Sequence, residues 1–247
     1  MKLSETVSLV ASGTAGCSYT HPNDCNVYAV RCGTKFVLID SGAGVETSRI
    51  VDILREDGFD PERMEALLLT HGHLDHAGGA AWIHKHLGVP VFASAETAAA
   101  LESGDEDFIS LSRAKAAGIY SGDFVFQPCP VQRQVSDGDE WKIGDTSFRV
   151  LATPGHSCDM ITYFIDCGGR TLAFPGDTVF HGGTILLSDT HDCDPAAYSR
   201  SLRRLASKFI HGLFPGHGLW SLRDGQEQIR KCLPFLDRLL LPPNLTL

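Results

Sequence analysis

The sequence predicts an α/β fold in which helices cover the outer faces of β-sheets. Short continuous apolar runs alternate along the chain with segments that place apolar residues at helical spacing. Apolar runs without polar alternation are typical of strands that are buried on both faces and need covering helices. No low-complexity tract, charge block or linker-like stretch interrupts the 247 residues. We therefore expect one domain over residues 1–247.

Strand-like segments share a length of five to eight residues and an excess of aliphatic, β-branched and aromatic side chains. They comprise residues 25–30, 35–40, 65–70, 90–94, 146–153, 160–166 and 170–174.

Amphipathic spacing predicts the helices. One of them has a start signal, with Asp194 as N-cap and Pro195 at the first helical position. A C-terminal helix is expected as well, with a kink at Pro234, because proline removes a helical hydrogen bond. The apolar faces consist of Ile50, Ile53 and Leu54; Ala80, Ile83 and Leu87; Tyr198, Leu202, Leu205 and Phe209; and Ile229, Leu233, Leu236 and Leu240.

Residues 95–130 differ from the rest of the chain. Two short helical segments, residues 95–103 and 107–118, precede a loop that carries Tyr120 and Phe124. Long connections inside compact domains are often functional. We predict that residues 95–130 form an insert or lid over the active site.

The net charge, the apolar stretches and the cysteines of the sequence indicate which kind of partner and which compartment to expect. The formal net charge of −9 argues against a nucleic-acid substrate, which needs clustered Lys and Arg. No apolar stretch is long enough to span a bilayer, and the N-terminus lacks a signal-peptide pattern. The eight cysteines form no CxxC pair and fit free thiols in a reducing compartment. We expect a cytoplasmic protein with a small-molecule substrate; the sequence carries no signal for an oligomeric state.

A short segment directly after the apolar run 67–69 concentrates metal-ligand side chains. It contains His71, His73, Asp75 and His76. Neighbouring imidazoles repel one another when they are protonated, and buried imidazoles need hydrogen-bond partners that are hard to supply. Such a cluster therefore indicates a function. A buried strand delivers these side chains to a loop.

Three later segments repeat this arrangement. In each, an apolar strand ends in a Pro-Gly turn, and the next residue is His156, Asp177 or His217. Pro presets φ at the first corner of a type II turn, and Gly accepts the positive φ at the second. A rigid turn holds the following side chain in a fixed place, as a coordination site requires. A fifth strand end carries Asp40.

The first four strand ends together offer five histidines and two aspartates. That is more than one four-coordinate zinc ion takes, and it suits two metal ions. Imidazole and carboxylate ligands without thiolate favour zinc, with iron or manganese as substitutes.

The HxHxDH pattern followed by separated His, Asp and His resembles the metallo-β-lactamase superfamily, over residues 38–218. The resemblance is to its glyoxalase II-like and lactonase-like members, which keep a bridging aspartate. It implies an αββα four-layer sandwich with two facing mixed β-sheets and two Zn²⁺ ions. It also implies the ligands: His71, His73 and His156 for the first metal, Asp75, His76 and His217 for the second, Asp177 between them, and Asp40 orienting a histidine.

The same resemblance implies hydrolysis by a hydroxide that bridges the two metals. We expect Asp75 to be the catalytic residue that orients the nucleophile and takes its proton. His181 and Cys158 lie close to ligands in sequence, and the sequence leaves open whether they contact the substrate. His84 and His86 are expected on the surface of a helix.

The sequence differs from individual branches of the superfamily, and these differences limit the expected class of substrate. β-Lactamases of this fold generally replace the bridging aspartate, so at most a weak β-lactamase activity is expected here. Only one helix is expected after His217, which argues against glutathione specificity, and Phe180 stands where quorum-quenching lactonases carry a tyrosine. A small-molecule thioester, lactone or other ester is therefore the expected substrate. The alternatives are a mononuclear iron persulfide dioxygenase using His71, His156 and Asp177, or a metal-binding module without catalysis.

Overall fold

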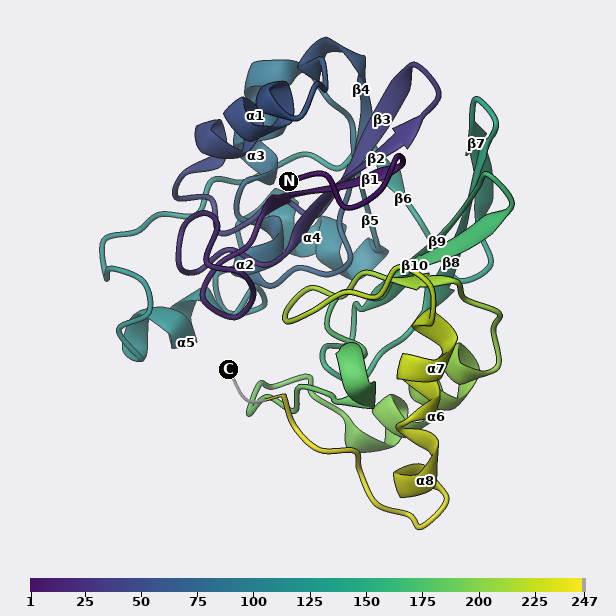
Figure 1. Ribbon diagram of the computed structural model, residues 1–247. Helices are drawn as coiled ribbons and strands as arrows, with labels where there is room; N and C mark the ends of the chain where they lie inside the picture. The colour runs from purple at the N-terminus through teal and green to yellow at the C-terminus, as the bar shows by residue number, and fades with distance from the viewer. Residues whose placement is uncertain (246–247) are drawn as a thin grey trace. The chain divides into compact units, whose positions relative to one another are not determined.

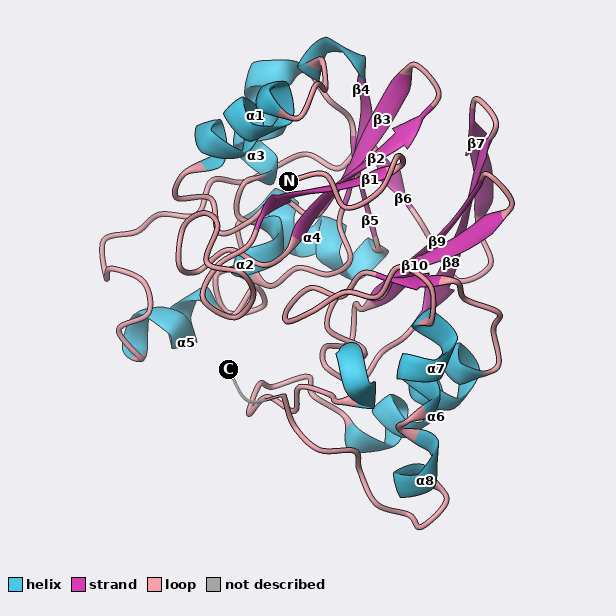
Figure 2. Ribbon diagram, viewed as in Figure 1, coloured by secondary structure: helices cyan, strands magenta, loops and turns pink. Residues whose placement is uncertain are grey.

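The computed structural model describes residues 1–245 and is traced in Figure 1. Contacts along the chain divide it into two compact units, Met1–Val135 and Ser136–Leu247. Each unit contains one β-sheet and its own helices (Figure 2). The mixed α/β class with two mixed sheets is therefore confirmed, whereas the single domain over residues 1–247 stays a prediction.

The first unit is built on a six-stranded sheet in the order β1-β2-β3-β4-β5-β6. β1, β2 and β3 are antiparallel neighbours, and β3 to β6 run parallel, so the sheet is mixed. Parallel neighbours end at the same edge of a sheet, so the residues that follow β3 and β4 lie beside each other. The strands are β1 (Val7–Ala11), β2 (Val27–Cys32), β3 (Lys35–Ile39), β4 (Met64–Leu68), β5 (Val91–Ala93) and β6 (Arg133–Gln134).

Helices α1 and α3 lie beside the first sheet (Figure 2). Ile50 and Ile53 of α1 and Ile83 of α3 share a buried core with Leu38 and Leu67 of the strands. The apolar faces predicted for these two helices are thus the faces that pack. Phe209 and Leu240, which were predicted on the apolar faces of later helices, are instead 73% and 57% exposed. The helical segments are α1 (Thr47–Glu56), η1 (Pro61–Arg63), α2 (Leu74–Ala77), α3 (Ala80–Leu87), α4 (Ala95–Ser103) and α5 (Leu111–Ala116).

The second unit is built on a five-stranded sheet in the order β11-β10-β9-β8-β7. Its strands are antiparallel neighbours except for β10 and β11, which are parallel. The strands are β7 (Glu140–Ile143), β8 (Thr146–Ala152), β9 (Ile161–Cys167), β10 (Arg170–Phe174) and β11 (Gly212–Leu213). The helical segments are η2 (His181–Gly183), α6 (Pro195–Ala206), α7 (Gly225–Arg230) and α8 (Leu233–Leu236).

The core of the second unit forms between α6 and its sheet. Leu202 and Leu205 of α6 are fully buried in one cluster with Phe164 of β9 and Ala173 of β10. The predicted N-cap of α6 is confirmed, because the Asp194 carboxylate accepts hydrogen bonds from two backbone N–H groups of the first turn.

Some local predictions differ from the structure. The C-terminal helix is divided into α7 and α8, and Pro234 lies in the first turn of α8, where its missing N–H is tolerated. All seven predicted strand segments are present, and β11 is the strand expected before the turn to His217, but β1, β6 and β7 were not predicted. β6 is only two residues long, too short to show a pattern. Within residues 1–245, no helix is long and apolar enough to cross a bilayer.

Leu202→Ala tests the contribution of α6 to stability. Leu202 is fully buried, so the truncation removes apolar contacts and leaves a cavity, and we expect unfolding to become easier by about 3 kcal/mol. The urea midpoint measures this loss. Arg200→Ala, at an exposed position of the same helix, serves as the matched control and is expected to leave the midpoint nearly unchanged. A Leu202→Ala midpoint equal to that of the control would contradict the packing described here.

Candidate metal centre

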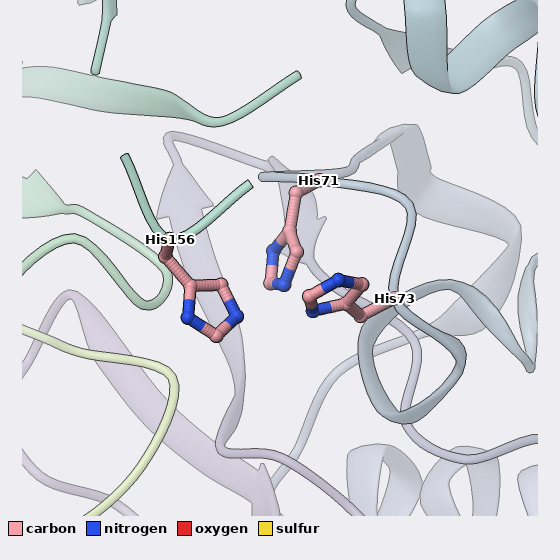
Figure 3. A group of neighbouring side chains, drawn as sticks. All are labelled: His71, His73 and His156. Atoms are coloured by element: carbon pink, nitrogen blue, oxygen red, sulfur yellow. The ribbon is translucent and has the colours of Figure 1, made fainter. Parts of the chain in front are cut away.

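The loop after β4 gathers three buried imidazole rings. His71 and His73 lie on the extended segment that follows the strand, and His76 lies in α2, whose N-cap is His73. The ring centroids are 4.7 Å apart for His71 and His73 and 4.1 Å apart for His71 and His76. Figure 3 shows His71 and His73 projecting toward each other from this loop. The first unit thus brings its predicted histidine ligands together.

Asp40, directly after β3, holds this loop in place. Its carboxylate accepts hydrogen bonds from the Thr70 backbone N–H at 2.8 Å and the Thr70 hydroxyl at 2.9 Å. Its Oδ2 lies 2.9 Å from Nδ1 of His76. Because a carboxylate only accepts, Nδ1 carries the proton in the neutral ring and the lone pair is left on Nε2. Asp40 itself has φ 61°, a left-handed backbone that Asp adopts more readily than most residues.

Asp75 is the most exposed of the predicted ligands, with 31% of its side chain accessible. Its Oδ2 lies 3.6 Å from Nε2 of His76. The backbone carbonyl of Asp75 accepts a hydrogen bond from the Cys25 N–H at 3.3 Å, which ties α2 to the segment before β2. The carboxylate is therefore both close to a ligand nitrogen and accessible to solvent.

Cys25 is a neighbour of this loop that sequence reasoning missed. Its thiol is fully buried, and its Sγ lies within 4.8 Å of ligand-type atoms of Asp40 and His76. Burial raises the pKa of the Cys25 thiol to about 12, although His76 acts in the opposite direction. The thiol stays protonated at neutral pH and packs against the imidazole in that form.

His156 is the first ligand-type residue of the second unit and follows β8 on a loop of its own (Figure 3). Its Nδ1 lies 2.8 Å from the carbonyl oxygen of Leu186, so Nδ1 again carries the proton and Nε2 the lone pair. A Cβ at Gly155 would lie 2.4 Å from Cα of Tyr198, so only glycine allows this approach to α6. Gly155 has φ 152°, and the predicted type II turn is wrong here because the contact with α6 sets the backbone.

Asp177 lies between two histidines of the second unit. Its Oδ2 is 3.6 Å from Nε2 of His156 and 3.4 Å from Nε2 of His217. The two strand-end loops are joined, because the Gly216 N–H donates to the Gly176 carbonyl at 2.8 Å. Gly176 has φ 53°, the positive value expected for its Pro-Gly turn. The second unit thus brings its three predicted ligands together around one carboxylate oxygen.

Tyr198 connects the loops of the second unit, although its sequence pattern indicates only a core position. Its hydroxyl donates to the Asp177 carbonyl at 2.6 Å and accepts from the Leu186 N–H at 3.3 Å. Burial raises the pKa of the Tyr198 hydroxyl well above its usual value, so the group remains a donor. The Leu186 carbonyl in turn holds His156. One buried hydroxyl therefore positions the backbone around two ligands.

The chemistry of the donor atoms fits a divalent metal. Two ligand atoms that share a tetrahedral zinc ion at about 2.0–2.2 Å lie roughly 3.3–3.6 Å from each other. The three Nε2 to Oδ2 separations within the units are 3.4, 3.6 and 3.6 Å, longer than hydrogen bonds and close to that spacing. The acceptors at Nδ1 of His76 and His156 leave Nε2 of each ring as the metal-binding atom.

The other residues singled out in the sequence take different positions. His84 and His86 lie in α3, and their Nδ1 atoms contact backbone carbonyls at 2.9 and 2.8 Å, which gives both rings a local partner. His181 begins the short helical turn η2. Cys158 is exposed, and its backbone N–H donates to Asp192.

A model of the metallo-beta-lactamase superfamily matches residues 21–227, which is most of the chain and includes all seven predicted ligands. The chain belongs to the metallo-β-lactamase superfamily. Members of this superfamily bind divalent metals, and the predicted hydrolase with a metallo-β-lactamase fold is confirmed. The assignment of the seven residues to individual metal ions, and of Asp75 to catalysis, stays a prediction.

Named relatives include thioesterases. The chain is 28% identical to the atrochrysone carboxyl ACP thioesterase of Aspergillus fumigatus over 78% of its own length and 50% of that protein. It is 27% identical to the acyl-coenzyme A thioesterase MBLAC2 of Gallus gallus, over 81% of the chain and 74% of that protein. The chain thus spans about half the length of the Aspergillus relative.

Solved structures share the fold. A metallo-β-lactamase with a HARLDQ motif from Cronobacter sakazakii superposes with a TM-score of 0.69 at 21% identity, covering 88% of this chain and 80% of that one. The protein TTHA1623, solved in a di-iron-bound form, superposes with a TM-score of 0.66 at 28% identity, covering 85% and 96%. The metallo-β-lactamase fold expected from the resemblance is confirmed.

Asp40→Asn tests whether the carboxylate selects the His76 tautomer. An amide has only one acceptor end, so either Thr70 or His76 faces an N–H group and the Nε2 lone pair is lost from part of the population. We expect zinc affinity to fall about 10- to 100-fold, measured by competition with a fluorescent chelator. Asp52→Asn, on the exposed face of α1, is the control. Equal zinc affinity of Asp40→Asn and wild type would refute the tautomer argument.

Proposed function

We propose that this chain is a dinuclear zinc hydrolase that cleaves a small acyl thioester. The observation that carries the proposal is the pair of ligand groups, one in each unit, that present unprotonated Nε2 atoms and carboxylate oxygens at metal-ligand spacing. The thioesterase names of two relatives support a thioester over the lactones and other esters that the sequence also allows.

In this proposal the metal ligands divide as the family resemblance implies. Asp177 would contribute to holding both ions, because one of its oxygens lies close to two imidazole nitrogens. Zinc ions bound in this way supply an activated water and a Lewis acid for the carbonyl. The remaining ligands are His71, His73 and His156 for one ion, and Asp75, His76 and His217 for the other.

Protein groups perform the proton transfers. Hydrolysis forms a bond between the water oxygen and the acyl carbon and breaks the bond between that carbon and sulfur. Asp75 accepts the proton of the attacking water and returns it to the leaving thiolate. Asp40 keeps His76 in one tautomer while this happens, and the Leu186 carbonyl does the same for His156.

The metal content of the purified protein is the first test. We expect about two zinc ions per chain by elemental analysis, since a seven-ligand set suits a dinuclear site. His217→Ala is expected to retain about one. His86→Ala, which removes an exposed histidine of α3, is the control and should keep the wild-type content. About one iron per chain with little zinc would favour the persulfide dioxygenase instead. Two irons per chain would support a dinuclear site that holds iron in place of zinc; TTHA1623 was solved in a di-iron-bound form.

Asp75→Ala tests whether the Asp75 carboxylate acts in catalysis. We expect kcat for butyryl-coenzyme A hydrolysis, followed by thiol release, to fall about 1,000-fold, because a positioned base contributes 10²- to 10⁴-fold. Glu96→Ala, an exposed acid in α4, serves as the control. Near-normal turnover by Asp75→Ala at full metal content would remove Asp75 from the mechanism. Turnover of lactones but of no thioester by the wild type would overturn the substrate class.

A further inference from the structure

Helix α8 ends in a tight turn that two backbone hydrogen bonds close. The Leu240 N–H donates to the Phe235 carbonyl at 3.0 Å, and the Leu239 N–H donates to the Leu236 carbonyl at 3.1 Å. This pair of bonds is the Schellman motif, in which one residue after the helix adopts the left-handed conformation. That residue is Leu239, with φ 58°. Glycine usually occupies this position, because it has no side chain to clash with the backbone.

Leu239 is unfavourable at this position in two respects. A leucine in the left-handed region is strained, because its Cβ crowds the backbone. The residue is also 94% exposed, so its packing within residues 1–245 offsets little of that strain. Backbone strain of this kind is concentrated at functional positions. The leucine therefore indicates a partner that contacts it from outside the fold.

Two further large apolar side chains lie on the same turn. Leu240 is 57% exposed and Phe235 is 36% exposed. We call Phe235, Leu239 and Leu240 the apolar tip. In Figure 1, α8 and the loop after it lie at the lower edge of the second unit, in yellow. Single exposed apolar residues are common on protein surfaces, but an exposed group of them marks a surface that binds a partner or a membrane.

Positive charge accompanies the apolar tip. Arg238 directly precedes Leu239, Lys231 lies one turn before Phe235, and both cations are exposed. The acid of the same turn is neutralised, because Asp237 Oδ1 lies 2.8 Å from Nη1 of Arg203 on α6. Residues 195–245 hold eight Lys and Arg but three Asp and Glu, in a chain whose net charge is −9. The partner that complements this surface is therefore both apolar and anionic.

We propose that the apolar tip inserts into the surface of an anionic lipid bilayer, with Lys231 and Arg238 against the lipid headgroups. Apolar side chains gain by leaving water for the acyl boundary, and cations are attracted to anionic lipids. A protein partner fits less well, because a stable interface buries roughly 800 Å² on each side, far more than a single turn offers. This interaction does not depend on the proposed hydrolase function.

Leu239→Gly tests the proposal, because it is expected to change stability and lipid binding in different ways. Glycine suits the positive φ, so the urea midpoint should equal or exceed that of wild type. Affinity for vesicles of phosphatidylcholine and phosphatidylserine in equal parts, measured by co-sedimentation, should fall about tenfold with the loss of the leucine side chain. Val125→Ala, at a 65% exposed aliphatic residue of the first unit, is the control and should match wild type in both measurements.

Arg238→Glu tests the electrostatic contribution. The change replaces an attraction to phosphatidylserine by a repulsion, so we expect vesicle affinity to fall at least about tenfold. Wild-type binding should weaken as salt is added, because ions screen exposed charges. Vesicles of phosphatidylcholine alone should bind the wild type only weakly. Turnover of butyryl-coenzyme A should be the same in wild type, Leu239→Gly and Arg238→Glu; if no protein turns over a thioester, the proposed function fails while the vesicle measurements still decide this proposal.

Three results would overturn the proposal. Wild-type protein might stay in the supernatant with phosphatidylserine vesicles, in which case the tip binds no anionic bilayer. Equal vesicle affinity of wild type and Leu239→Gly would mean that the leucine is not inserted. Self-association of the wild type without lipid, observed by analytical ultracentrifugation and abolished in Leu239→Gly, would assign the apolar tip to an interface between copies of this chain.

Discussion

The hydrogen bond between Asp40 and His76 is the interaction on which the metal-binding loop of the first unit depends. A buried imidazole binds a metal only through an unprotonated nitrogen, and a neutral ring has one such atom. The carboxylate at Nδ1 determines which atom that is, and its other contacts hold the Thr70 backbone at the start of the loop. The left-handed conformation of Asp40 is the local strain that allows one residue to reach both partners.

In the second unit a backbone carbonyl, and not a carboxylate, determines which nitrogen of the histidine carries the proton. Nδ1 of His156 contacts the carbonyl oxygen of Leu186. The buried hydroxyl of Tyr198 accepts a hydrogen bond from the Leu186 N–H and donates one to the carbonyl of Asp177. The absence of a side chain at Gly155 lets this loop approach α6 closely enough for the network to form. Ring orientation therefore depends on tertiary packing here, whereas in the first unit it depends on a carboxylate at a strand end.

This difference explains how much of the site could be predicted. The ligand types and Asp40 were readable, because each follows an apolar strand and the HxHxDH cluster is local in sequence. Tyr198 was not recognised as a residue of the site, since a tyrosine on an apolar helix face has the pattern of a core residue whatever its hydroxyl does. Leu186 contributes only its carbonyl, which no side-chain pattern encodes. The fold followed the same rule only in part. Seven strand segments of five to eight residues were predicted, and the two-residue β6 depends on pairing with β5, but the five-residue β1 was missed although all of its residues are buried.

The two buried tyrosines show how the hydrogen bonds of a hydroxyl decide its contribution to stability. Tyr198 has its bonds completed by the protein, so its hydroxyl contributes to the stability of the loops that carry Asp177 and His156. Tyr120 is also buried, but within residues 1–245 its hydroxyl has no hydrogen-bond partner. A buried hydroxyl without a partner lowers stability, because it loses the bonds that water provided in the unfolded chain. The two hydroxyl groups therefore contribute to the stability of their units in opposite directions.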